Sequence, residues 1–231
     1  MSQTNWFDLA PLLGETTPGA FLSQRNSHYR GISLAKHREN LARELGLAVE
    51  RISIPGQIHG PKIQLAVPGQ IHEETDGLFT NDPDVVLTLQ VADCAAVFFY
   101  HAATGFRGLV HAGWRGLAAG VLKNGAELLK AHDVELNQAK VVIGPTIEQA
   151  CYEVGSEVVE HFSPALWQPN SNGRYQLDLA GAVREQLQDA GIAAEKISSL
   201  EVCTRCDPRC HSYRREGAQA GRMIAFYYQQ L

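Results

Sequence analysis

The chain has 231 residues, of which 45% are hydrophobic and 19% are charged, and its formal net charge is −5. This length and balance are typical of a globular protein with a sizeable core. The chain has no basic stripe, which argues against a nucleic-acid partner. Its longest central apolar run, residues 95–100, is far too short to cross a bilayer, so we expect no membrane partner either.

The first eight residues lack the basic and apolar regions of a secretory signal. Five cysteines are an odd number, which does not fit a disulfide scaffold. We therefore predict a cytoplasmic protein whose cysteines are free for metal binding or catalysis.

A helix is predicted first, over residues 33–47, because Ser33 is a suitable N-cap and Gly46 stands near the end. Short runs rich in Val, Ile, Leu and Phe follow, each bounded by turn residues, and they predict strands. These runs are residues 51–54, 62–67, 78–80, 85–90, 95–100 and 107–110.

The second half of the chain mixes helices and strands. Helices are predicted at 117–131, 154–162 and 179–190, the last with Asp178 as its N-cap, and strands at 141–143, 197–202 and 223–228. Most connections between strands are too short for a crossover helix, which favours antiparallel pairing. We predict one α/β (α+β) domain over 1–231, with mixed or antiparallel sheets covered by helices, and not a doubly wound Rossmann sheet.

One five-residue sequence occurs twice, at 55–59 and at 68–72. It is too short to indicate a repeat architecture. It marks either two equivalent strand entries or a chance recurrence.

Three metal-capable side chains each stand at the end of an apolar run beside small residues. They are His59, Cys94 and His111. Two imidazoles and one thiolate suit a catalytic zinc ion that keeps its fourth position open, and the same ligands would also hold copper. The alternative is that each is an ordinary structural residue, because a free cysteine is commonly a small buried apolar side chain.

Several segments, taken in chain order over nearly the whole length, resemble the laccase-domain family. Its members are called multicopper polyphenol oxidase-like proteins, purine nucleoside phosphorylases or peptidoglycan-editing factors. The segment His111–Gly116 is the most specific part of the resemblance. The other matching segments are 57–60, 76–80, 92–94, 144–147, 151–155, 177–179, 203–204, 212–217 and 221–222.

The resemblance implies a four-layer α/β/β/α sandwich with mixed sheets. It also implies that His59, Cys94 and His111 are the metal ligands and catalytic residues. We place Arg25, Asp93 and Arg115 among the substrate-binding residues: Arg25 by the resemblance, and Arg115 because its planar fork suits phosphate. Asp93 either orients a metal ligand as a neighbouring carboxylate or caps a turn.

The other histidines receive weaker assignments. His72 is an alternative first ligand because it ends the second copy of the repeated sequence, but Glu73 follows it where the family pattern has glycine. The remaining candidates are interpreted as surface or core histidines. They are His28, His37, His101, His132 and His161.

Four further potential ligands, Cys203, Cys206, Cys210 and His211, lie within nine residues. Taken alone this spacing resembles a structural zinc knuckle. The competing view is that Cys203 and Cys206 fill family positions that need no metal. We expect these four residues to hold none.

The resemblance implies a zinc-dependent purine nucleoside phosphorylase, acting with phosphate on adenosine, inosine, guanosine and 5′-methylthioadenosine, with adenosine deaminase activity as a companion. We expect a monomer or weak homodimer. A copper-dependent polyphenol oxidase ranks second, since zinc itself has no redox chemistry. The third hypothesis is a cysteine hydrolase acting on a peptidoglycan precursor, with Cys94 as nucleophile and His111 as base. The fourth is a non-catalytic metal-binding partner protein.

Overall fold

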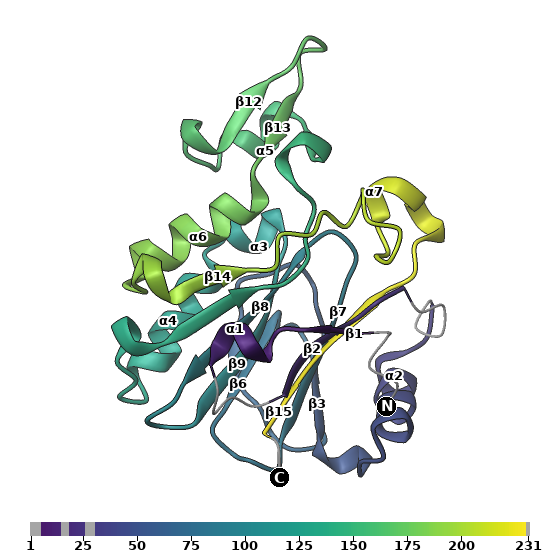
Figure 1. Ribbon diagram of the computed structural model, residues 1–231, viewed down its shortest axis with the longest axis vertical. Helices are drawn as coiled ribbons and strands as arrows, with labels where there is room; N and C mark the ends of the chain where they lie inside the picture. The colour runs from purple at the N-terminus through teal and green to yellow at the C-terminus, as the bar shows by residue number, and fades with distance from the viewer. Residues whose placement is uncertain (1–5, 15–18, 26–30, 230–231) are drawn as a thin grey trace.

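The structure is a computed structural model that describes residues 6–14, 19–25 and 31–229. Two six-stranded sheets form its centre (Figure 1). The first sheet has the order β1 (Trp6–Asp8), β2 (Gly19–Ser23), β15 (Met223–Tyr228), β7 (Val86–Val91), β3 (Ile52–Pro55) and β5 (Ile71–His72). The second has the order β14 (Ile197–Ser199), β10 (Lys140–Ile143), β8 (Ala95–His101), β9 (Phe106–Ala112), β6 (Gly77–Thr80) and β4 (Ile63–Leu65).

Helices cover the outer faces of both sheets. On the first sheet lies α2 (Leu34–Leu45), and on the second lie α3 (Trp114–Ala118), α4 (Val121–Lys130) and α6 (Leu179–Ala190). The described residues also form three short helices, α1 (Ala10–Leu13), α5 (Ser156–Val159) and α7 (Tyr213–Glu216). Single 3-10 turns are η3 (Val49–Arg51), η4 (Leu136–Gln138), η5 (Gln149–Cys151), η6 (Pro164–Leu166), η7 (Ala194–Lys196) and η8 (Gly217–Gln219). The predicted mixed α/β class and four-layer sandwich are confirmed.

The layers follow from the alternation of side chains along the strands. In β15, Met223, Ala225 and Tyr227 pack into the core between the two sheets. The intervening residues, Ile224 and Phe226, face the other way and pack against α2. Both faces of this strand are therefore buried, which explains its nearly continuous apolar sequence.

The sheets contain parallel as well as antiparallel pairs. Strand β8 pairs antiparallel with β9 and β10, as the short connections predicted, but β3 pairs parallel with β5 and β7, and β4 with β6. These parallel pairs need no crossover helix because the chain alternates between sheets, with β3, β5 and β7 in the first and β4, β6 and β8 in the second.

Two predicted helices were wrong in extent. The helix expected over 117–131 is divided into α3 and α4, because Gly120 adopts a left-handed conformation (φ 83°, ψ 33°). The helix expected over 154–162 is only the single turn α5, preceded by strand β11 (Glu153–Val154). Gly155 is its extended N-cap, and Pro164, which begins η6, removes a backbone donor that a longer helix would need.

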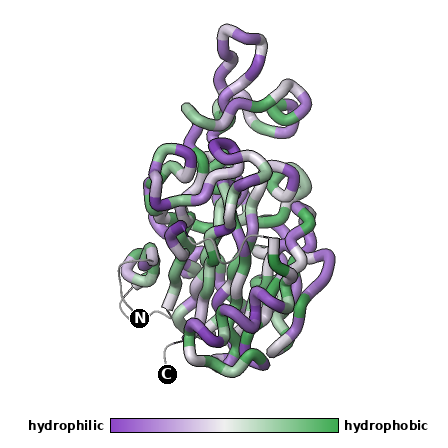
Figure 2. Tube along the Cα trace, turned by 90° about the vertical axis from the view of Figure 1, so that its right-hand side faces the viewer, coloured by the Kyte–Doolittle hydropathy of each residue, from purple (hydrophilic) through white to green (hydrophobic). Residues whose placement is uncertain are grey.

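Strand β11 belongs to a third, small sheet that the sequence analysis did not predict. Its order is β11, β13 (Tyr175–Leu177) and β12 (Trp167–Pro169). The hairpin of β12 and β13 projects beyond the four layers and carries mostly hydrophilic residues at its tip (Figures 1 and 2). Hydrophobic residues instead run through the body of the molecule (Figure 2).

The two copies of the repeated sequence are not equivalent. Ile71 and His72 form β5, whereas Gln57 and His59 lie in the loop after β3 with positive φ angles. The recurrence is therefore not a pair of matching strand entries. None of the helices in the described residues is both long and apolar enough to cross a membrane.

Candidate functional site

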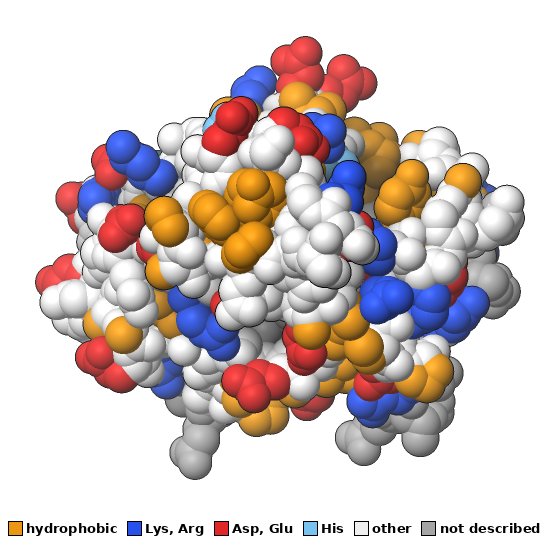
Figure 3. Space-filling model, turned by 90° about the horizontal axis from the view of Figure 1, so that it is seen from above, with side chains coloured by type: hydrophobic (Ala, Val, Ile, Leu, Met, Phe, Trp, Pro, Cys, Tyr) orange, Lys and Arg blue, Asp and Glu red, His pale blue; other side chains and the backbone are white. Residues whose placement is uncertain are grey.

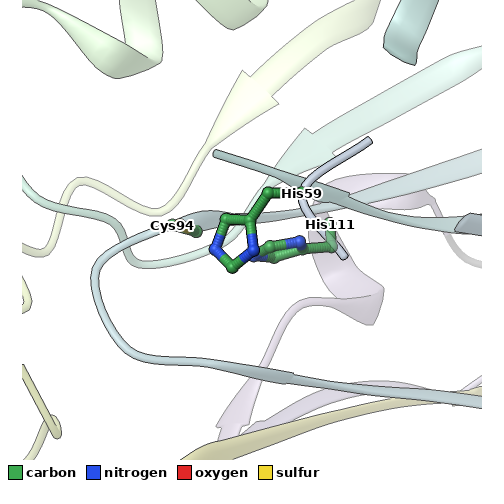
Figure 4. A group of neighbouring side chains, drawn as sticks. All are labelled: His59, Cys94 and His111. Carbon is green, nitrogen blue, oxygen red and sulfur yellow. The ribbon is translucent and has the colours of Figure 1, made fainter. Parts of the chain in front are cut away.

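His59, Cys94 and His111 converge at one end of the two central sheets. His59 lies in the loop after β3, Cys94 between β7 and β8, and His111 in β9, opposite Ala96 of β8. One ligand atom from each of the three lies within 4.8 Å of the others. The two imidazole rings meet edge to face, with centroids 4.7 Å apart, and Cys94 lies beside them (Figure 4). We call these residues the His-Cys-His site.

Asp76 holds two of these three residues in place. Its Oδ1 accepts hydrogen bonds from His111 Nδ1 at 2.8 Å and from the backbone N–H of His59 at 2.9 Å. Its Oδ2 accepts from the backbone N–H groups of Ile58 and Gly60. The bond to Nδ1 leaves Nε2 of His111 free to bind a metal, which is the usual role of such a carboxylate.

The site is polarised toward a thiolate and a protonated imidazole. Burial raises the pKa of Cys94, but the charge and hydrogen bond of His111, together with His59, outweigh it and lower this pKa to about 6. Burial lowers the pKa of His111, but the Cys94 charge and the hydrogen bond to Asp76 raise it to about 9. A metal cation would take the position of the proton beside this thiolate.

The backbone around the site is strained. Three of the five non-glycine residues with positive φ in the described part of the chain, Gln57, His59 and Asp93, line the same pocket. Such conformations cost about 1–3 kcal/mol each and persist only where surrounding contacts enforce them. For Gln57 these contacts are the two hydrogen bonds between its side-chain amide and the Gln90 backbone.

The pocket over the His-Cys-His site has a volume of about 580 Å³. Three arginines, Arg115, Arg214 and Arg222, and three aromatic residues line it. The aromatic residues are Trp114, Tyr152 and Tyr213. Seen from above, basic side chains gather in a band to the right of centre on this face of the molecule (Figure 3).

The predicted substrate-binding residues fall in different places. Arg115 lines the pocket and stacks over Trp114 at 4.4 Å, and its guanidinium has no hydrogen-bond partner among the described residues. Asp93 also lines the pocket, but its carboxylate accepts hydrogen bonds from the Thr204 hydroxyl and the Arg214 backbone N–H, both at 2.6 Å. Arg25 does not line the pocket and forms an ion pair with Glu216 at 2.9 Å.

The alternative ligand His72 lies apart from the site. It is buried in β5, where its Nε2 accepts a hydrogen bond from the Val67 N–H. Among the remaining histidines, His37 and His101 are buried and His132 and His161 are exposed, while His28 lies outside the described residues.

Asp76, Tyr152, Arg214 and Arg222 are functional candidates for which no role was predicted from the sequence. All four lie inside segments that carry the family resemblance, so the resemblance was the available signal. Their functional grouping depends on tertiary contacts that spacing alone does not reveal.

The C-terminal ligands expected to hold no metal do not form one group. Cys210 is fully buried in the core between the sheets, and His211 lies beside Glu216, with its Nδ1 3.3 Å from the carboxylate. Cys203 and Cys206 instead meet Cys151, a residue that the sequence analysis had not grouped with them.

Comparison with known families gives one match that spans most of the chain. Residues 30–230 match the sequence profile of the family described as multi-copper polyphenol oxidoreductase laccase.

Two named proteins are similar to this chain over most of its length. A protein named purine nucleoside phosphorylase YlmD, from Geobacillus stearothermophilus, is 35% identical, with 84% of this chain and 77% of that one covered. A protein named adenosine deaminase RL5, from an unknown prokaryotic organism, is 29% identical, with 84% and 80% covered. The crystal structure of YlmD from Geobacillus stearothermophilus superposes with a TM-score of 0.89 at 30% identity, covering 100% of this chain and 98% of that one.

Proposed function

The chain belongs to the multi-copper polyphenol oxidoreductase laccase family, and because a relative with 35% identity is named purine nucleoside phosphorylase, we propose that it is a zinc-dependent purine nucleoside phosphorylase. Its catalytic domain would span 1–231 and act in the cytoplasm, where free thiols such as the five cysteines of this chain persist. The observation that carries the proposal is the combination, in one pocket, of a two-imidazole, one-thiolate site with arginine and aromatic side chains.

The residues of the His-Cys-His site fit a zinc ion. The ligand atoms are close enough to share one metal, since zinc lies about 2.0–2.3 Å from nitrogen and sulfur ligands. Three protein ligands leave a fourth position open, as catalytic zinc sites require. When bound there, zinc would supply a fixed positive charge that orients phosphate or activates water.

The pocket walls offer the contacts that the two substrates need. The exposed Arg115, with its fork unoccupied by protein groups, suits the phosphate, and Arg214 and Arg222 add positive charge. The rings of Tyr152 and Tyr213 offer faces on which a purine can stack. Phosphate would attack C1′ of the ribose, the glycosidic C–N bond would break, and ribose 1-phosphate and the free base would leave.

The relative named adenosine deaminase supports a second activity of the same site. Adenosine, inosine, guanosine and 5′-methylthioadenosine remain the proposed substrates, and deamination of adenosine would accompany phosphorolysis. Copper in place of zinc would be required for the oxidase chemistry that the family description names.

The test is phosphate-dependent release of adenine from adenosine by the zinc-loaded protein, with Cys94→Ala and His59→Ala as site variants. We expect each variant to lose at least about a hundredfold in rate, since one preorganised charge interaction is commonly worth that much. The matched control is His132→Ala, another exposed histidine, which lies outside the pocket and should keep the wild-type rate.

Near wild-type phosphorolysis by Cys94→Ala would refute the site assignment. Release of ammonia without ribose 1-phosphate would leave only the deaminase activity. Oxidation of phenols by the copper-loaded protein, with no phosphorolysis in zinc, would replace the phosphorylase proposal by the oxidase one.

A further inference from the structure

Three cysteines from two distant segments meet outside the His-Cys-His site. Cys151 ends η5, and Cys203 and Cys206 lie in the loop after β14. Their sulfur atoms all lie within 4.8 Å of one another, and the sulfurs of Cys151 and Cys206 are 3.3 Å apart. Burial falls from Cys203, which is buried, through Cys151 to the exposed Cys206. We call these residues the three-cysteine cluster.

We propose that the three-cysteine cluster binds a second zinc ion, with a structural role. Tetrahedral zinc with sulfur ligands at about 2.3 Å holds those sulfurs about 3.8 Å apart, close to the spacing here. Cys203 and Cys206 have the two-residue separation typical of zinc-binding loops. Thiolates also select zinc over magnesium or calcium.

The charge around the cluster suits a bound thiolate–zinc group. Three thiolates and one divalent zinc leave a net charge of about −1. Arg205 compensates this charge, because its Nη1 lies 3.5 Å from the sulfur of Cys151. In the described part of the chain no fourth histidine, cysteine or carboxylate joins the group, so water would complete the coordination.

The backbone already holds the two segments in register. Thr146 and Cys203 form a parallel bridge, and the Thr204 N–H donates to the Thr146 carbonyl at 3.1 Å. The N–H of Cys206 donates to the Cys203 carbonyl, closing the loop between the two ligands. The two segments therefore need little rearrangement to bind a metal ion.

This second zinc would support one wall of the pocket. Cys151 immediately precedes Tyr152, which lines the pocket, and the Thr204 hydroxyl between the two loop cysteines donates to Asp93. The proposal replaces the expectation that Cys203 and Cys206 hold no metal, which was drawn without Cys151. It does not depend on the proposed phosphorylase activity.

The experiment measures zinc in a protein that lacks the first site. Cys94→Ala is reduced, stripped with a chelator, dialysed against zinc and analysed by elemental analysis. We expect about one zinc per chain. Cys94→Ala/Cys206→Ser should lose most of it, whereas the matched control Cys94→Ala/Cys210→Ala should keep it, because Cys210 lies in the core away from the cluster. Cys94→Ala/Cys206→His, which restores a ligand, should regain uptake.

A second measurement covers the case in which a double variant fails to fold. Cobalt(II) added to Cys94→Ala should give intense thiolate-to-metal absorption with tetrahedral d–d bands. The proposal is overturned if Cys94→Ala binds neither zinc nor cobalt. It is also overturned if Cys206→Ser leaves uptake unchanged, or if the mass of the protein purified under reducing conditions shows a disulfide between Cys151 and Cys206.

Discussion

The carboxylate of Asp76 and the imidazole of His111 form a buried hydrogen bond of 2.8 Å between Oδ1 and Nδ1. Both side chains are almost inaccessible to solvent. Asp76 comes just before β6 and His111 lies in β9, and the antiparallel pairing of Gly77 with Val110 sets the distance between them. The sheet itself therefore orients this histidine toward the site.

Replacing Asp76 should lower the affinity of the His-Cys-His site for metal while the two sheets keep their fold. In Asp76→Asn one carboxylate oxygen becomes an amide nitrogen that cannot accept, and because each oxygen accepts two hydrogen bonds, two of the four are lost. Loss of such a supporting carboxylate commonly costs ten- to a hundredfold in metal affinity. We expect a drop in that range, measured by zinc competition with a chelator. Asp84→Asn, at an exposed carboxylate, is the control, and equal affinities would refute the role of Asp76.

The helices whose boundaries were predicted well are those with local signals. Ser33 accepts a hydrogen bond from Lys36 N–H, and Gly46 ends the helix in the left-handed conformation. Asp178 caps the helix over 179–190 in the same way, by accepting from Gly181 N–H. Both signals lie within a few residues of the helix, so the sequence contains them directly.

The missed features depend on contacts between distant segments. The Asp76–His111 bond requires β6 to pair with β9, and the grouping of Cys151 with Cys203 requires the bridge that Thr146 forms with Cys203. No local pattern specifies either pairing. The candidate ligands His59, Cys94 and His111 were noticed because each stands at the end of an apolar run beside small residues, and the resemblance to a known family then favoured them over ordinary structural residues.

Arg115 is predicted to bind phosphate and to contribute little to the binding of the nucleoside. Arg115→Lys keeps the charge but loses the planar two-pronged donor, which is worth about 1.5–3 kcal/mol when it binds an anion. We expect the KM for phosphate to rise by about ten- to a hundredfold, with the KM for adenosine nearly unchanged. Initial rates at varied phosphate measure this, with the exposed Arg43→Lys as control. A rise confined to adenosine would show that Arg115 binds the other substrate.

Gly113 is predicted to be required for space beside the metal ligands. It has φ −92° and ψ 168°, which any residue can adopt, so conformational freedom does not explain it. A Cβ atom there would lie 2.8 Å from Cys94 Sγ and 3.2 Å from His59 Cδ2. We expect Gly113→Ala to displace both ligands and lower zinc content, with thermal unfolding close to wild type. Full zinc content in the variant would show that the ligands can move without loss of the site.

His37 gives the fold a predicted sensitivity to acid. The ring is fully buried and lies between two polar neighbours. The Thr88 hydroxyl donates to the Ala225 carbonyl, so it accepts from His37 Nε2, 3.3 Å away. The Gln90 amide nitrogen, 2.5 Å from Nδ1, donates to the other ring nitrogen. These two contacts fit the neutral imidazole, and burial lowers the pKa of His37 to about 3.

The direction of the effect follows from proton binding. In the unfolded chain His37 has a pKa of 6.5, so between pH 6.5 and about 3 the unfolded state binds a proton that the folded state does not. The free energy of unfolding therefore carries no penalty from His37 above pH 6.5. Between pH 6.5 and about 3 it falls by about 1.4 kcal/mol for each pH unit of acidification. Between about pH 7 and about pH 5 the wild type should lose about 2 kcal/mol more than His37→Gln, which cannot titrate. Urea unfolding at both pH values measures this difference, with the exposed His132→Gln expected to parallel the wild type.

Equal losses in wild type and His37→Gln would mean that the folded protein accepts a proton at His37, against the hydrogen-bond arrangement described.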